Sequence, residues 1–206
     1  MAMLREYSEL DAREARENLR VIRQLMERST KYSTFSGLSG VFAGLTSIVG
    51  CLITRQLNAR ALPSAAYRAQ FLLTWSLVIL AAIGADYLLT KRRAARVGKR
   101  ILSRLGKQMV VASAPGLGSG ALLTLYLLKH HLFAEIFPVW MLCYGMAVCA
   151  VGLFSQREVS LLGAAFLLAG AATLLLPPTL GLTMMALSFG GFHIVYGIAM
   201  TRRDGW

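Results

Sequence analysis

The stretch STFSGLSGVFAGLTSIVGCLI (33–53) contains 21 consecutive residues without a single charge. A helix rises about 1.5 Å per residue, so about 20 apolar residues cross the ~30 Å hydrocarbon core of a bilayer. The stretch therefore predicts a transmembrane helix. Further stretches of similar length and character follow it, at about 70–90, 108–128, 136–155, 159–176 and 180–200.

The composition of the whole chain agrees with this interpretation. Of the 206 residues, 56% are hydrophobic and 16% are charged, whereas a soluble domain has roughly 45–50% apolar and about 25% charged residues. Six spans leave no room for a separate soluble domain. We therefore predict an all-α polytopic membrane protein, with a six-helix transmembrane domain over residues 33–206.

Residues 1–32 differ in composition and predict a separate charged helix. Apolar residues recur at helical spacing and form one apolar stripe, which contains Ala15, Leu19, Ile22 and Met26. The six acidic and seven basic residues nearly cancel, so charge alone does not hold this helix on anionic lipid. The high charge also argues against a cleavable signal peptide. We expect a cytoplasmic amphipathic helix that docks on the bundle or on a cytoplasmic protein partner.

The lysine and arginine residues are distributed unevenly between the two ends of the predicted spans. Eight of the 22 lie in 91–107, seven precede the first span and two follow the last, whereas three lie in 54–69. Short loops rich in Lys and Arg stay on the cytoplasmic side. Both termini are therefore predicted to be cytoplasmic. This asymmetry explains the net charge of +12 without a nucleic-acid partner.

Small residues recur on one face of three predicted spans. In lipid, helices approach closely where such residues line the contact. The first, fourth and sixth spans carry these faces, which predict helix–helix interfaces. Each face serves either packing within the chain or, for the first span, docking of another subunit. The residues are Ser36, Gly40 and Gly44, then Gly145, Cys149 and Gly152, then Gly190 and Gly197.

Two ionisable residues inside the predicted spans are candidate polar sites. His193 lies on the glycine-lined face of the sixth span. Two interpretations of His193 remain open. It is either a neutral ring hydrogen-bonded to a neighbouring helix or a functional group, since ionisable residues at that depth usually point inward. Asp86 lies about one turn from the cytoplasmic edge of the second span. Its alternatives are a carboxylate paired with a nearby base and a proton or cation site.

Other sequence patterns do not point to catalysis or cofactors. The glycine run 114–120 lacks the Gly-Lys-Ser/Thr ending of a phosphate loop and predicts a kink or break in the third span. Glu135 lies near His130 and His131 without metal-ligand spacing, so we expect no metal site. These two histidines lie too near the surface to share a haem iron with His193. We expect no catalytic residue and no cofactor.

The chain resembles a known group of proteins in three stretches: IRQLMERSTKYSTFSGLSGVFAGL (22–45), WMLCYGMAVCAVGLFSQREVSLLG (140–163) and FGGFHIVYG (189–197). Together they resemble uncharacterised bacterial six-helix membrane proteins with a short charged N-terminal helix. The resemblance runs along the whole chain. It implies the same fold, but it carries over no functional residue.

Two functions of different classes remain open from the sequence. Well-formed packing faces without site chemistry favour a non-enzymatic accessory subunit or regulatory scaffold of a membrane complex, associated with another membrane subunit or with itself. The alternative is a small transporter or channel that uses a broken third helix together with His193 and Asp86.

Overall fold

The computed structural model describes residues 17–22, 36–60, 62–96 and 104–204. The elements in these ranges are all helices, which confirms the all-α fold. Residues 17–22 are helical with exposed side chains, and the rest of the predicted N-terminal helix lies outside the described residues. Residues 97–103 of the basic run 91–107 also lie outside them.

The helices follow the predicted spans in order. The first five segments are α2 (Gly37–Ala59), α3 (Ser64–Arg96), α4 (Arg104–Lys129), α5 (Ile136–Gly152) and α6 (Arg157–Leu175). The sixth, called the last segment below, is composed of η1 (Pro178–Leu180), α7 (Gly181–Met185), the π-helix η2 (Ala186–Phe192) and α8 (His193–Asp204). The π-helix was not predicted.

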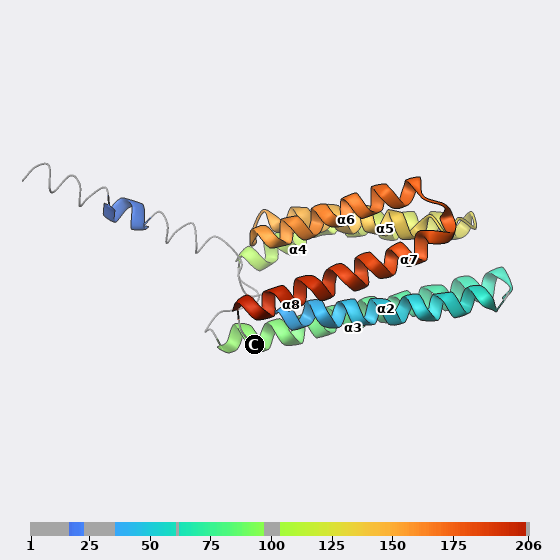
Figure 1. Cartoon of the computed structure of the whole chain (residues 1–206), viewed down its shortest axis with the longest axis horizontal. Coiled ribbons are helices and arrows are strands. Elements are labelled where there is room, and N and C mark those ends of the chain that lie inside the picture. Colours follow the sequence, from blue (N-terminus) through green and yellow to red (C-terminus); the bar gives the residue numbers. More distant parts are fainter. Residues whose placement is uncertain (1–16, 23–35, 61, 97–103, 205–206) are drawn as a thin grey trace, which may run out of the picture.

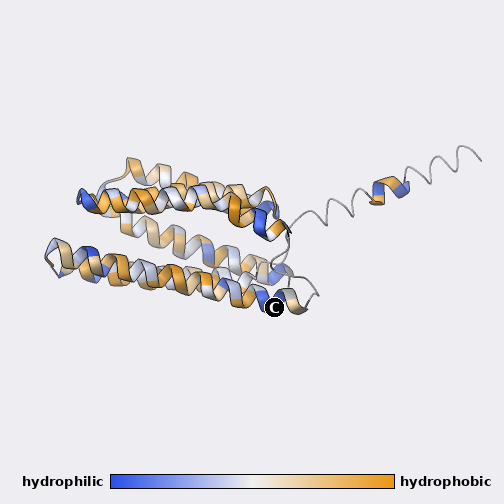
Figure 2. Ribbon diagram, turned by 180° about the vertical axis from the view of Figure 1, so that it is seen from behind, coloured by the Kyte–Doolittle hydropathy of each residue, from blue (hydrophilic) through white to orange (hydrophobic). Residues whose placement is uncertain are grey.

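Five of these segments are long and apolar enough to cross a membrane, namely Gly37–Ala59, Ser64–Arg93, Leu105–Lys129, Arg157–Leu175 and Pro178–Arg203. The remaining segment, α5, is also apolar but has 17 residues. Figure 2 shows hydrophobic residues along the middle of the helices and hydrophilic residues gathered toward their ends. By length and hydropathy, the chain is a multi-pass membrane protein.

The helices form two groups of three. In one group α5 packs on both α4 and α6, and in the other α2 packs on both α3 and the last segment. Figure 1 shows the last segment between α4–α6 on one side and α2–α3 on the other. We call the end of the bundle that contains Lys91, Arg157 and Arg202 the basic end, and the end that contains residues 60 and 130 the opposite end.

The last segment packs on α2 through close backbone contact. A Cβ atom added to Gly44 would lie 2.6 Å from the carbonyl oxygen of Gly190. One added to Gly197 would lie 2.5 Å from the Gly37 oxygen and 2.6 Å from the Val41 nitrogen. No side chain fits at such distances. The small-residue face of the first span is therefore occupied within the chain.

A second glycine-lined contact joins α5 to α6. The face of α5 with Gly145, Cys149 and Gly152 packs on α6, where a Cβ atom on Gly163 would lie 2.7 Å from the backbone nitrogen of Cys149. The two helices form the most extensive pair in the bundle. Small residues thus allow close approach here as well, as expected for helices in lipid.

The predicted break in the third span is absent. Pro115 lies inside α4, which continues from Arg104 to Lys129. A Cβ atom on Gly116 would lie 2.7 Å from the Cys143 carbonyl oxygen, so Gly116 lets α4 pack closely on α5, whereas Gly118 has nothing within 4 Å. This packing offsets the weak helix propensity of glycine and the hydrogen bond that proline cannot donate.

Aromatic side chains join the two groups at the opposite end. The Tyr67 ring lies edge-on to Phe133, with 4.7 Å between ring centroids. Phe71, which is 2% exposed, lies 6.4 Å from Phe137 by the same measure. The N-terminal part of α3 is thereby held against the start of α5, although most of α3 packs on α2.

Substituting Gly197→Ala should destabilise the bundle by about 1–3 kcal/mol, because the added methyl group meets backbone atoms that cannot move aside independently. Gly84→Ala is the matched control, since a Cβ atom at Gly84 has nothing within 4 Å. The control should keep or raise stability, because alanine favours helix over glycine by about 1 kcal/mol. Apparent melting temperature in detergent, followed by size-exclusion chromatography, measures both effects. Equal melting temperatures for the two variants would contradict the close-packing argument.

Candidate functional site

His193 begins α8 directly after the π-helix and is 7% exposed. Its Nδ1 atom lies 2.9 Å from the Phe189 carbonyl oxygen, and its Nε2 atom lies 2.7 Å from the Tyr144 hydroxyl. A carbonyl oxygen can only accept a hydrogen bond, so Nδ1 carries the proton. In the neutral ring Nε2 then accepts a hydrogen bond from Tyr144. This arrangement matches the alternative of a neutral ring bonded to a neighbouring helix.

Aromatic rings surround this hydrogen bond. Phe166 of α6 is 0% exposed, and its ring centroid lies 4.8 Å from that of Tyr144 and 5.3 Å from that of His193. Phe189 of η2 lies 4.7 Å from Phe166 and 4.9 Å from Tyr144. The rings come from both helix groups, so the cluster joins them in the middle of the bundle. Few water molecules fit among rings packed at this spacing.

The π-helix η2 ends directly before His193. A π turn contains more residues than an α turn, and such turns occur frequently at functional sites. Gly190 within η2 packs against α2, and a Cβ atom at Gly40 of α2 would lie 3.2 Å from the His193 carbonyl oxygen. The backbone of His193 therefore faces α2, whereas its ring faces Tyr144 of α5.

Asp86 lies on α3 where this helix meets the start of α2. Its Oδ1 atom lies 2.6 Å from the Ser39 hydroxyl and 3.4 Å from the Thr90 hydroxyl. The Ser39 hydroxyl also lies 2.7 Å from the carbonyl oxygen of Ser36, the residue that precedes α2. Ser36, Ser39 and Thr90 are all buried. Hydroxyl groups thus bind the carboxyl group of Asp86, for which the sequence left open a nearby base or a proton or cation site.

The structure brings the two candidate polar residues into one region. The Tyr144 hydroxyl, which contacts His193, also lies within electrostatic reach of Asp86 and of Tyr196 on α8. Asp86 and His193 belong to helices of the same group, and Tyr144 belongs to the other group. The Tyr144–His193 hydrogen bond therefore crosses between the groups, whereas the hydrogen bonds of Asp86 stay within one group.

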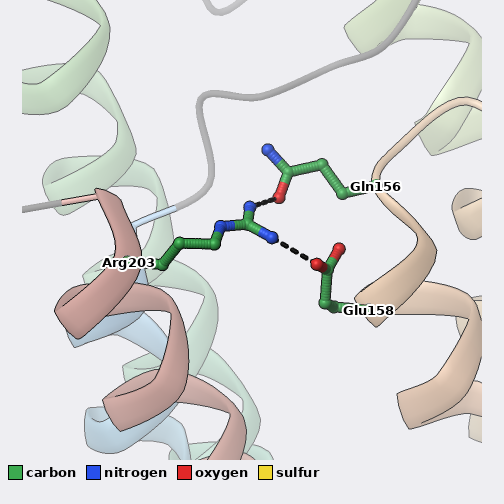
Figure 3. A network of polar contacts seen from close by, with 3 residues as sticks. All are labelled: Gln156, Glu158 and Arg203. Carbon is green, nitrogen blue, oxygen red and sulfur yellow. Dashed lines mark hydrogen bonds and ion pairs between the residues drawn. The ribbon is translucent and has the colours of Figure 1, made fainter.

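A polar contact at the basic end joins the same two groups. The guanidinium group of Arg203, near the end of α8, donates hydrogen bonds to Glu158 in the first turn of α6 and to the side-chain oxygen of Gln156 just before it (Figure 3). The Arg203 and Glu158 side chains are 43% and 42% exposed. An ion pair with that much exposure contributes about 0–1 kcal/mol.

The remaining sequence candidates do not assemble into a site. Within the described ranges, no three His, Cys, Asp or Glu side chains lie close enough to hold a metal ion together. The His130 ring lies against Tyr126 at an interplanar angle of 43°, with 4.4 Å between ring centroids. His131 occupies the left-handed region, with φ 61°, in the turn after α4.

Comparison with known proteins identifies no relative: no protein-family model, curated protein or solved structure matches the chain. The resemblance to bacterial six-helix membrane proteins receives no support from these comparisons. Fold and hydropathy define the class, a helical multi-pass membrane protein.

Sequence reasoning missed Tyr144, Ser39 and Arg203 as partners in these polar contacts, and it missed Phe166 as a ring packed against Tyr144. Tyrosine in membrane proteins concentrates at the two lipid–water interfaces. Tyr144 instead lies near the middle of α5. That unusual depth was the one signal that could have identified it.

Substituting Tyr144→Phe should lower stability by about 1–3 kcal/mol, because His193 Nε2 then remains buried without a donor. Tyr126→Phe is the control, since Tyr126 is 56% exposed. Unfolding in a mixed-micelle titration measures both variants. The double variant Tyr144→Phe with His193→Phe should lose less stability than the two single variants lose together, because neither polar side chain is then left without its partner. Strictly additive losses would contradict a direct Tyr144–His193 interaction.

Proposed function

We propose that this chain is a non-enzymatic integral protein of a bacterial inner membrane, which acts as an accessory subunit or regulatory scaffold of a membrane complex. It crosses the membrane six times and keeps both termini in the cytoplasm. Its partner is another membrane subunit or a second copy of the chain.

The six-span topology rests on α5 and on the distribution of charge. The 17 residues of α5 are at the lower limit of about 17–25 for a crossing helix. With α5 counted as a span, the run 91–107, with eight Lys and Arg residues, lies on the same side as both termini. The tendency of such runs to remain inside then places the basic end in the cytoplasm.

The observation that carries the scaffold proposal is that very little of α3 is buried in the bundle. In an apolar stretch of 18 residues within α3, only 6% is buried. The corresponding share is 39% in α2 and 33% in α6. Small residues also gather in one part of α3, namely Ala81, Ala82, Gly84 and Ala85. A helix that contacts the bundle along one side and has small residues at mid-depth is suited to pack against a further transmembrane helix.

The described part of the N-terminal region supports a cytoplasmic partner. In residues 17–22, Leu19 is 65% exposed and Ile22 is 52% exposed. These two residues belong to the apolar stripe of the charged helix. Apolar side chains at helical spacing are a typical docking surface for a partner protein.

A photocrosslinking residue at Leu80 of α3 tests the scaffold proposal directly in native membranes. Leu80 is 65% exposed, and the matched control is Leu168 of α6, which is 73% exposed. The proposal predicts one protein adduct of defined mass from position 80 and none from position 168. A self-associating chain would give an adduct near twice 22.5 kDa. Lipid adducts alone at both positions would rule out a partner on α3.

A second candidate is a small transporter or channel that moves a proton or cation. The observation in its favour is that Asp86, at the contact of α2 and α3, and the Tyr144–His193 pair, between the two helix groups, supply carboxyl, hydroxyl and imidazole groups inside the bundle. Ionisable residues inside a membrane commonly mark ion pathways. The unbroken α4 no longer contributes to this proposal.

The transport candidate predicts that Asp86→Asn and His193→Ala each reduce ion flux into proteoliposomes at least tenfold while the protein remains monodisperse. Glu135→Gln is the control, since Glu135 lies in the turn before α5, away from this region. A dye sensitive to pH, or to the cation supplied, measures the flux. Wild-type flux no greater than that of empty liposomes would end the transport proposal.

A further inference from the structure

A hollow of about 230 Å³ lies between α2 and α3 near the opposite end of the bundle. We call it the α2–α3 groove. It lies where the two helices approach the turn that joins them. Its lining residues include Ile53, Gln56 and Arg60 from α2, and Gln70, Leu73 and Thr74 from α3.

Three polar side chains line this groove without any described partner. Among the described residues, no hydrogen bond or ion pair engages the side chains of Gln56, Arg60 or Gln70, whereas the Thr74 hydroxyl donates to the Gln70 carbonyl oxygen over 2.8 Å. The guanidinium group offers five N–H donors and each amide offers two. Donors gathered in one groove suit an anion with several acceptor oxygens, and arginine is well matched to phosphate.

The order of residues along the groove suits an amphiphile. Arg60 caps the C-terminal end of α2 at the turn. At about 1.5 Å per residue, Gln56 lies about one helical turn deeper and Ile53 about two turns deeper. On α3, Gln70 likewise lies nearer the turn than Leu73. Ile53 and Leu73 are 40% and 60% exposed. The polar part of the groove therefore lies toward the membrane surface, and the apolar part lies where acyl chains run.

The surrounding charge favours an anionic ligand. Residues 54–69 contain Arg55, Arg60 and Arg68 and no acidic residue. The hydroxyl of Tyr67 donates a hydrogen bond to the Asn58 side-chain oxygen over 2.6 Å, which ties the ends of the two helices together. This contact lies outside the lining of the groove and joins the two helices near its polar part.

We propose that the α2–α3 groove binds the phosphodiester headgroup of an anionic membrane phospholipid, with Arg60, Gln56 and Gln70 as its donors and Ile53 and Leu73 against its acyl chains. The site requires only that the chain is embedded in a bilayer. It is independent of whether the protein acts as a scaffold or as a transporter.

Native mass spectrometry of the full-length protein in detergent tests this proposal. Phosphatidylglycerol, phosphatidylethanolamine and inorganic phosphate are added separately to delipidated protein. The wild type should retain phosphatidylglycerol in preference to phosphatidylethanolamine. Arg60→Gln should weaken that binding about tenfold or more, as expected when a charge-assisted hydrogen bond is lost. Gln70→Leu should weaken it as well, and it preserves the charge of the chain.

Arg55→Gln is the matched control, because Arg55 lies on the same helix end and outside the lining of the groove. It removes the same charge and should weaken binding less than threefold. Equal losses from Arg55→Gln and Arg60→Gln would overturn the proposal in favour of diffuse attraction. Inorganic phosphate that displaces the lipid at millimolar concentration would overturn it in favour of a free-anion site. Equal binding of the two phospholipids would also overturn it.

Discussion

The contact between α2 and the last segment is the constraint on which the rest of the arrangement depends. Gly44 meets Gly190, and Gly197 meets Gly37, with no space for a Cβ atom at either crossing. Helices in lipid gain little from the hydrophobic effect, so this close backbone approach supplies dispersion contacts that larger residues would prevent. It also places the π-helix against α2 and leaves the His193 ring on the side of α5.

From this contact, three different kinds of interaction hold the two helix groups together. Aromatic rings at Tyr67 and Phe133 join them at the opposite end, and the buried His193–Tyr144 pair joins them in the middle. The exposed Arg203–Glu158 pair joins them at the basic end. Exposed ion pairs are much weaker than buried contacts that exclude water.

The distribution of exposed surface divides the helices by role. The spans of α2, α6 and the last segment bury a larger share of their residues than those of α3 and α4, which reach the common core mainly through Phe71 and through Leu127 and Leu128. The exposed face of α3 suits a transmembrane partner at mid-depth, and the groove near its N-terminal end suits a phospholipid headgroup. These two surfaces lie at different depths along one helix, so lipid and partner can bind at the same time.

The sequence by itself determined the all-α class, the position of each helical segment to within about six residues at its ends and the hydropathy of a membrane protein. These properties are local, because they follow from runs of apolar residues and from where charges interrupt them. Tertiary structure decided which helices pair, why Pro115 lies within a continuous helix and where His193 points. Those outcomes depend on contacts between residues such as Gly44 and Gly190 that are far apart along the chain. A small residue predicts that a close approach is allowed, but only the packed bundle selects the helix that makes it.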